Sequence, residues 1–101
     1  MENDIADQQL IVNEIENQFE LQLEGGKAVV EYILTGDKIN LIHTEVPQQF
    51  SGKGIAGILV KKVLEYIKDK NWILTPSCSY VAKYVDNHPE YHSLLSEGYR
   101  M

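Results

Sequence analysis

The fold of this chain is decided at residues 45–57, which read Glu45-Val46-Pro47-Gln48-Gln49-Phe50-Ser51-Gly52-Lys53-Gly54-Ile55-Ala56-Gly57. Before this stretch apolar and polar residues alternate, and after it apolar residues recur at every third or fourth position. The first pattern is typical of β-strands and the second of an amphipathic helix. Glycines at such a junction let backbone N–H groups approach an anion at the positive end of the helix dipole. The stretch therefore predicts either an anion-binding turn or a plain strand-to-helix connection.

Charge is distributed unevenly along the chain, which has 101 residues and a formal net charge of −6. A length of this order is typical of one domain. An acidic chain is a poor match for nucleic acid, whose backbone is bound through clustered Lys and Arg. Five of the nine basic residues nevertheless lie in the segment that the glycines open: Lys53, Lys61, Lys62, Lys68 and Lys70. A locally basic helix start suits a small polyanionic ligand better than a polymer.

Cellular location is indicated by the cysteine count and by the apolar runs. The single cysteine, Cys78, excludes an internal disulfide and favours a reducing compartment. No apolar run approaches the ~20 residues of a membrane span, and the acidic start of the chain lacks the features of a signal peptide. We expect a cytoplasmic monomer with no nucleic-acid partner, no membrane contact and no metal site.

Four strand-like runs precede the junction, at residues 11–15, 19–24, 28–34 and 38–46. Successive strands joined by short turns, such as the one at Gly25-Gly26, form an antiparallel meander. In the fourth run, strict alternation predicts Ile39, Leu41, His43 and Glu45 on one face and Ile42, Thr44 and Val46 on the other.

After the junction the chain predicts a helix, a strand and further helical pieces. Helical spacing continues from Gly54 to about Lys70, where Asn71 is a suitable left-handed stop. Residues 72–75 form a short apolar run typical of a buried strand, and a second helix is expected over about 77–86, with a last helical piece near 90–96.

A strand–helix–strand unit has a right-handed crossover, which makes the fourth and fifth strands parallel neighbours. We therefore expect an α+β fold with a mixed, mostly antiparallel sheet of about five strands and helices packed on it. Residues 9–101 would form this single domain, and residues 1–8 a frayed tail.

Two motifs overlap at the glycines. Residues 52–57 match the GxGxxG pattern of dinucleotide-binding folds. That pattern follows the first strand of a parallel sheet, whereas an antiparallel meander precedes it here, and Thr75-Pro76 stands where an acidic ribose ligand is required. From Gln49 to Gly54 the same stretch also reads (Gln/Arg)-x-x-Gly-x-(Gly/Ala). This second pattern resembles the pyrophosphate-binding motif of the GNAT superfamily of acetyl-CoA-dependent N-acetyltransferases.

Further stretches resemble the minimal, single-domain members of that superfamily, namely residues 43–47, 52–56, 76–85 and 88–91. The resemblance implies the GNAT fold, with strands four and five splayed around the cofactor. It also implies an N-acetyltransferase that moves the acetyl group of acetyl-CoA to a primary amine. The alternative is a CoA-binding regulatory or interaction module with little or no turnover.

The resemblance also implies which residues meet the cofactor. The pyrophosphate would rest on the backbone amides of Phe50 to Ile55, and the pantetheine arm would run between the splayed strands. The residues expected at the cofactor are Val46, Gln49, Phe50, Ser51, Gly52, Lys53, Gly54, Ile55, Ala56, Cys78 and Tyr84.

Cys78 is the first candidate for chemistry. Its position predicts a thiol in the first turn of the second helix, with Ser77 or Thr75 as the cap, where the helix dipole favours the thiolate. Position alone favours a small buried hydrophobe, which is the commoner fate of a lone cysteine. The resemblance places this cysteine where the acetyl thioester ends.

His43 and Glu45 are the candidate bases, because either could take a proton from an ammonium group or from Cys78. Two mechanisms remain open at this point. Direct attack by an amine needs only a base and an oxyanion donor, whereas a ping-pong route through acetyl-Cys78 needs the thiolate and His43. Tyr80 or Tyr84 could protonate the leaving thiolate.

Overall fold

One sheet of five strands, in the order β1-β2-β3-β4-β5, organises the computed structural model, which describes residues 8–95. The strands are β1 (Ile11–Asn13), β2 (Gln18–Leu23), β3 (Gly26–Thr35), β4 (Lys38–Glu45) and β5 (Ile73–Pro76). The first four pair antiparallel and β4 pairs parallel with β5. The expected meander and the parallel pair are both confirmed. The expected tail at residues 1–8 lies outside the described residues except for Gln8.

Within residues 8–95, two α-helices and two short 3-10 helices connect and follow the strands. They are η2 (Gln48–Phe50), α1 (Ile55–Lys70), α2 (Ser79–Asp86) and η3 (Pro89–Leu94). The predicted stop of the first helix is confirmed, since Asn71 adopts the left-handed conformation (φ 61°) and donates its N–H to the last carbonyls of α1. The first strand is shorter than expected, because Ile15 lies in the β1–β2 turn and is 92% exposed.

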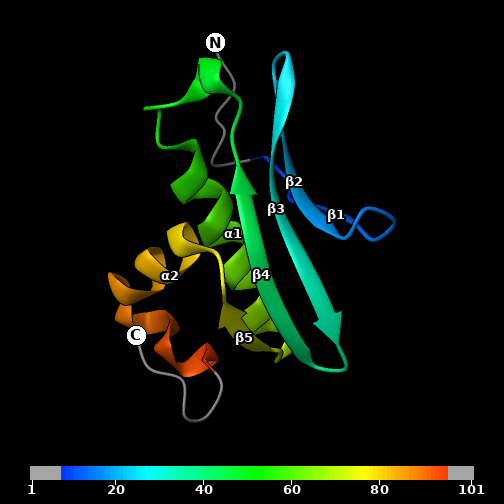
Figure 1. Cartoon of the computed structure of the whole chain (residues 1–101), viewed down its shortest axis with the longest axis vertical. Coiled ribbons are helices and arrows are strands. Elements are labelled where there is room, and N and C mark those ends of the chain that lie inside the picture. The colour runs from blue at the N-terminus through cyan, green and yellow to red at the C-terminus, as the bar shows by residue number, and fades with distance from the viewer. Residues whose placement is uncertain (1–7, 96–101) are drawn as a thin grey trace.

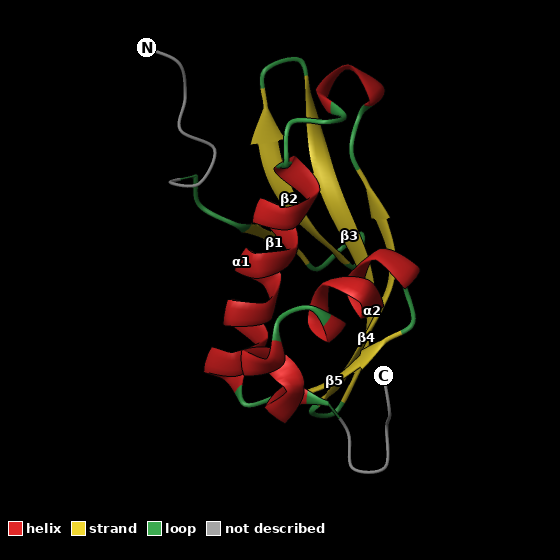
Figure 2. Cartoon of the chain, turned by 90° about the vertical axis from the view of Figure 1, so that its left-hand side faces the viewer, coloured by secondary structure: helices red, strands yellow, loops and turns green. Residues whose placement is uncertain are grey.

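The helices lie against one face of the sheet, and no described element covers the other (Figures 1 and 2). The core between helices and sheet is apolar throughout. Phe19, Leu21, Val30 and Leu41 from the strands and Leu59, Val63 and Ile67 from α1 are fully buried. We call the uncovered side the open face.

A bulge in β4 changes which residues face the helices. Glu31 pairs with His43 but Tyr32 pairs with Leu41, so Ile42 is an extra residue on β4. After Leu41, the next side chain of β4 that points toward the helices is therefore that of Thr44, which pairs with the buried Val30. The predicted grouping of His43 and Glu45 with Ile39 and Leu41 is wrong, because one extra residue reverses the alternation of every later side chain.

On the open face a buried carboxylate ties the first three strands together. Glu20, only 6% exposed, accepts hydrogen bonds from Gln18 Nε2 (2.7 Å), Asn13 Nδ2 (2.8 Å) and Lys27 Nζ (3.3 Å). These donors, the Gln18 amide foremost, hold the pKa of the Glu20 carboxyl below its usual range.

We expect Glu20→Gln to lower the free energy of unfolding at pH 7 by about 1–2 kcal/mol, since three hydrogen bonds lose the charged acceptor. A depressed folded-state pKa stabilises the fold above the unfolded-state pKa, and this contribution disappears as the pH falls through the folded-state value. Urea unfolding at pH 7 and at about pH 3 should therefore show a difference between the two proteins that shrinks in acid. Glu24→Gln, at an exposed turn position, is the control. A difference that does not depend on pH would contradict this role of Glu20.

Candidate functional site

The loop between β4 and α1 begins with a tight turn that uses two of its own amides. Phe50 N–H donates to Pro47 O (2.9 Å) and Ser51 N–H donates to Gln48 O (3.0 Å) within and just after η2. The amides of Phe50 and Ser51, both expected at an anion, thus already have backbone acceptors in this turn. The amides that remain begin at Gly52.

Gly52 and Gly54 shape the rest of this loop. Both have left-handed backbone conformations, with φ of 80° and 76°, which side-chain-bearing residues seldom adopt. A Cβ at either position would meet no atom within 4 Å, so it would project into open space above the loop. Bare backbone therefore faces that space at both glycines.

The start of α1 adds further donors beside these glycines. The first helical hydrogen bond at this end runs from Ile58 N–H to Gly54 O (3.2 Å), so the N–H groups of Ile55, Ala56 and Gly57 precede it. The positive end of the helix dipole lies at the same place, and the Lys53 side chain is exposed there. Residues 52–57, which we call the glycine loop, can thus bind an anion through the backbone.

Strands β4 and β5 separate beside this loop. Their pairing runs from Lys38 with Ile73 to Leu41 with Pro76, and Cys78 N–H then donates to Leu41 O (2.8 Å). Beyond Leu41, β4 continues to Glu45, while the segment that follows β5 turns away into α2 (Figure 2). Within residues 8–95 no strand pairs with this edge of β4, so its backbone groups can bond a ligand that carries amides.

Cys78 lies where the two strands separate, on the helix-covered side. It is the N-cap residue of α2 rather than a residue of the first turn, and no side chain caps that helix. The expected capping by Ser77 or Thr75 is therefore wrong. Cys78 is partly buried, and its Sγ is 3.3 Å from Thr44 Oγ1. Sequence reasoning missed Thr44 because strict alternation along β4 gave no sign of the bulge.

His43 and Glu45 lie together on the open face, opposite to Thr44. His43 Nε2 is 3.6 Å from Glu45 Oε1, and the two side chains are 55% and 68% exposed. Glu31 lies directly across from His43 on β3. The structure thus brings the two candidate bases together. It does not pair His43 with Cys78, because adjacent residues of a strand point to opposite faces.

Tyr84 lies where α2 approaches the start of α1. A Cβ at Gly57 would be 3.5 Å from the Tyr80 hydroxyl and 3.9 Å from the Tyr84 ring, so the glycine allows close packing of the two helices. Tyr84 stacks on His88, with ring centroids 3.9 Å apart, and burial raises the pKa of its hydroxyl. Both tyrosines line a hollow of about 400 Å³ on α2, beside the start of α1.

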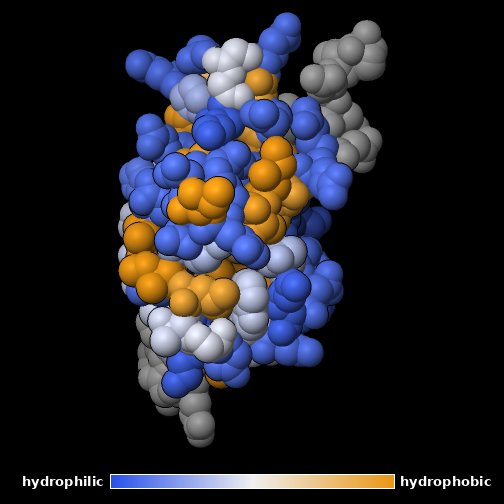
Figure 3. Space-filling model, turned by 90° about the vertical axis from the view of Figure 1, so that its right-hand side faces the viewer, coloured by the Kyte–Doolittle hydropathy of each residue, from blue (hydrophilic) through white to orange (hydrophobic). Residues whose placement is uncertain are grey.

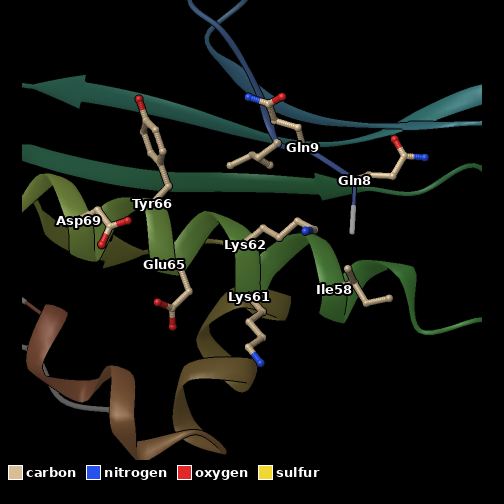
Figure 4. Close-up of a pocket in the computed structure, with 9 residues that line it drawn as sticks. Gln8, Gln9, Ile58, Lys61, Lys62, Glu65, Tyr66 and Asp69 are labelled. Carbon is tan, nitrogen blue, oxygen red and sulfur yellow. The ribbon is translucent and has the colours of Figure 1, made fainter. Parts of the chain in front are cut away.

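A larger groove, of about 600 Å³, lies elsewhere, between α1 and the chain before β1 (Figure 4). Ile58 and Tyr66 form apolar parts of its wall, and Lys61, Lys62 and Glu65 give it charges of both signs. None of the residues predicted to bind the cofactor lines it. We therefore place the candidate site at the glycine loop and the splayed strands rather than in this groove.

Comparison with known proteins agrees with this geometry. A family model described as GCN5-related N-acetyltransferase matches residues 18–94. The chain belongs to this family. Protein NATD1 of Xenopus tropicalis is 37% identical over 75 residues, which cover 71% of this chain and 69% of that protein. Protein NATD1 of Danio rerio is 35% identical over 79 residues, which cover 73% and 72%.

The fold is that of a solved GCN5-like protein as well. The solution structure of such a protein from Staphylococcus aureus superposes with a TM-score of 0.65 and 22% identity, covering 93% of this chain and 96% of that one. The resemblance to the GNAT superfamily and its mixed sheet with parallel β4 and β5 are thus confirmed. Among the described residues of this GCN5-related chain, no helix is long and apolar enough to span a bilayer.

Proposed function

We propose that this chain binds acetyl-CoA and transfers the acetyl group to a primary amine. The observation that carries the proposal is the bare glycine loop directly beside the open edge of β4. An anion site next to an unpaired strand edge fits a ligand with a pyrophosphate at one end and an amide-rich arm at the other. Family membership supports the same ligand, because acetyl-CoA is the usual acetyl donor of these enzymes.

The residues present fit that ligand in the following way. The free amides of residues 52–57 would hold the pyrophosphate, with Lys53 adding positive charge. Val46 and the edge of β4 would bond the pantetheine amides, and Tyr84 would line the arm from the side of α2. Gln49, Phe50 and Ser51 would support the loop, since the first amides of that turn are already bonded. When bound, acetyl-CoA supplies an acetyl group activated as a thioester.

Proton transfer would take place on the open face. The side chains on the two faces of β4 differ: Thr44 faces the helices, where its Oγ1 is 3.3 Å from Cys78 Sγ, and His43 and Glu45 face away. An ammonium group arriving from the open face would meet the imidazole of His43, whose free nitrogen lone pair accepts a proton. The Glu45 carboxylate beside it would stabilise the resulting imidazolium. Direct attack by the amine is the mechanism that this arrangement favours.

Turnover of acetyl-CoA with a panel of primary amines, followed by thiol release, tests the proposal. We expect release to depend on the amine, and we expect small amines and lysine side chains to be the acceptors. Tight binding of CoA with no amine-dependent release would contradict the enzyme assignment. That result would instead support the alternative of a CoA-binding regulatory or interaction module.

The role of Cys78 can be separated from the transfer itself. We expect wild-type protein incubated with acetyl-CoA alone to show no gain of an acetyl group in its intact mass, because Cys78 is hydrogen-bonded to Thr44 and has no base beside it among the described residues. Cys78→Ala should keep amine-dependent turnover within about tenfold of wild type. An acetyl adduct that disappears in Cys78→Ala would establish the ping-pong route and overturn direct attack.

A further inference from the structure

The open face carries hydrophobic groups among hydrophilic ones (Figure 3). Ile33 is 54% exposed and Ile42 is 38% exposed, although both belong to strands of the sheet. Single exposed apolar residues are ordinary on protein surfaces. These two differ because of where the β4 bulge puts them.

The bulge brings Ile42 to the same face as the candidate bases. Ile33 pairs with Asn40 and Glu31 pairs with His43, and the extra residue Ile42 lies between those two rows. Diagonal neighbours on one face of a sheet are within reach of long side chains. Ile33 therefore lies beside Glu31 on β3 and Ile42 lies beside His43 on β4, while Glu45 is the next residue of β4 on that face after His43. We call these five residues the open-face patch.

The charge of the open-face patch selects a cation. Glu31 and Glu45 flank the exposed imidazole of His43, and the chain as a whole carries a formal charge of −6. A small amine would use only the carboxylates. A lysine within a polypeptide would also place neighbouring side chains over the strands. Aliphatic side chains there would remove the exposed apolar surface of the two isoleucines from water, which is favourable.

Resting on the proposed function, we propose that the acceptor is a lysine within an extended polypeptide segment, docked on the open-face patch. The lysine ammonium lies between Glu31 and Glu45 at His43. Aliphatic side chains two residues before or after it in the peptide point to the same side and pack on Ile33 and Ile42, because alternate residues of an extended chain share a face. The patch thus selects aliphatic residues at alternate positions around the lysine.

Binding of a labelled, blocked Leu-Gly-Lys-Gly-Leu peptide to the CoA-loaded protein tests this inference by fluorescence anisotropy, without turnover. We expect Ile33→Thr/Ile42→Thr to weaken binding about fivefold, a change of about 1 kcal/mol. Threonine keeps the β-branched shape that suits a strand. Ile15→Thr is the matched control, since Ile15 is an isoleucine 92% exposed in the β1–β2 turn, outside the patch. It should bind the peptide as the wild type does.

Three results would overturn the inference. The first is unchanged peptide affinity in Ile33→Thr/Ile42→Thr. The second is that Ile33→Thr/Ile42→Thr weakens the binding of a peptide with serine in place of leucine by the same factor as it weakens the binding of the leucine peptide. That result would show that the isoleucines do not contact aliphatic groups. The third is a dimer in light scattering that the double variant dissociates, which would make the face an interface between copies of this chain. CoA affinity of Ile33→Thr alone, which we expect to be unchanged because Ile33 lies on β3 outside the proposed cofactor site, separates these results from failure of the proposed function.

Discussion

Gly54→Asp should lower the affinity for acetyl-CoA by a hundredfold or more. The substitution adds a carboxylate where the backbone is bare and φ is 76°, and its side chain would project into the space that the pyrophosphate is proposed to fill. Two like charges about 4 Å apart near a protein surface repel by about 4 kcal/mol. The change in binding is measured by isothermal titration calorimetry with acetyl-CoA.

Gly36→Asp is a matched control for this experiment. Gly36 also has a positive φ (63°), and a Cβ there would likewise meet no atom within 4 Å, but this glycine lies in the β3–β4 turn. Both variants therefore carry the same kind of backbone strain and the same added charge. We expect Gly36→Asp to lose some stability and to bind acetyl-CoA with wild-type affinity. Equal affinity in the two variants would show that the phosphate site lies elsewhere.

The double variant His43→Gln/Glu45→Gln should reduce kcat for amine acetylation by about a hundredfold at pH 7. A positioned base contributes roughly 10²–10⁴ to a rate, and the lower end suits side chains as exposed as these. Steady-state rates with a saturating amine measure the loss. Glu24→Gln, an exposed carboxylate in the β2–β3 turn, should leave kcat unchanged.

The pH dependence distinguishes a base from a binding group. A lysine side chain loses its own proton near pH 10, so the need for a base disappears as the pH approaches that value. The rate of the double variant should then approach the wild-type rate. A loss that stays constant up to about pH 9.5 would show that the pair only binds the acceptor.

Most of the fold followed from patterns that are local in the sequence. Alternation and the Gly25-Gly26 turn predicted the meander, helical spacing predicted α1, and Asn71 predicted where that helix ends. Parallel pairing of β4 with β5 followed from the handedness of the crossover. These predictions succeeded because each depends on the residues of one element and its turn.

The candidate site was predicted less completely, because its geometry depends on contacts between elements. The bulge at Ile42 has no signature in the sequence, and it moved His43 and Glu45 to the open face and Thr44 to Cys78. The turn at Gln48–Phe50 was also unforeseen, and in it the amides of Phe50 and Ser51 donate to backbone carbonyls. The glycines themselves were identified correctly as the junction between strand and helix, since only their own backbone was involved.

Nuclear magnetic resonance of the ¹⁵N-labelled protein titrated with acetyl-CoA tests the central claim most directly. We predict that the largest shifts in amide resonances fall on residues 52–57, on the edge of β4 and the residue after it, from Ile42 to Val46, and on Cys78. Amides along the groove of Figure 4, such as those of Lys61 and Tyr66, should move little. Shifts confined to that groove, or no saturable shift at all, would contradict the assignment of the glycine loop as the acetyl-CoA site.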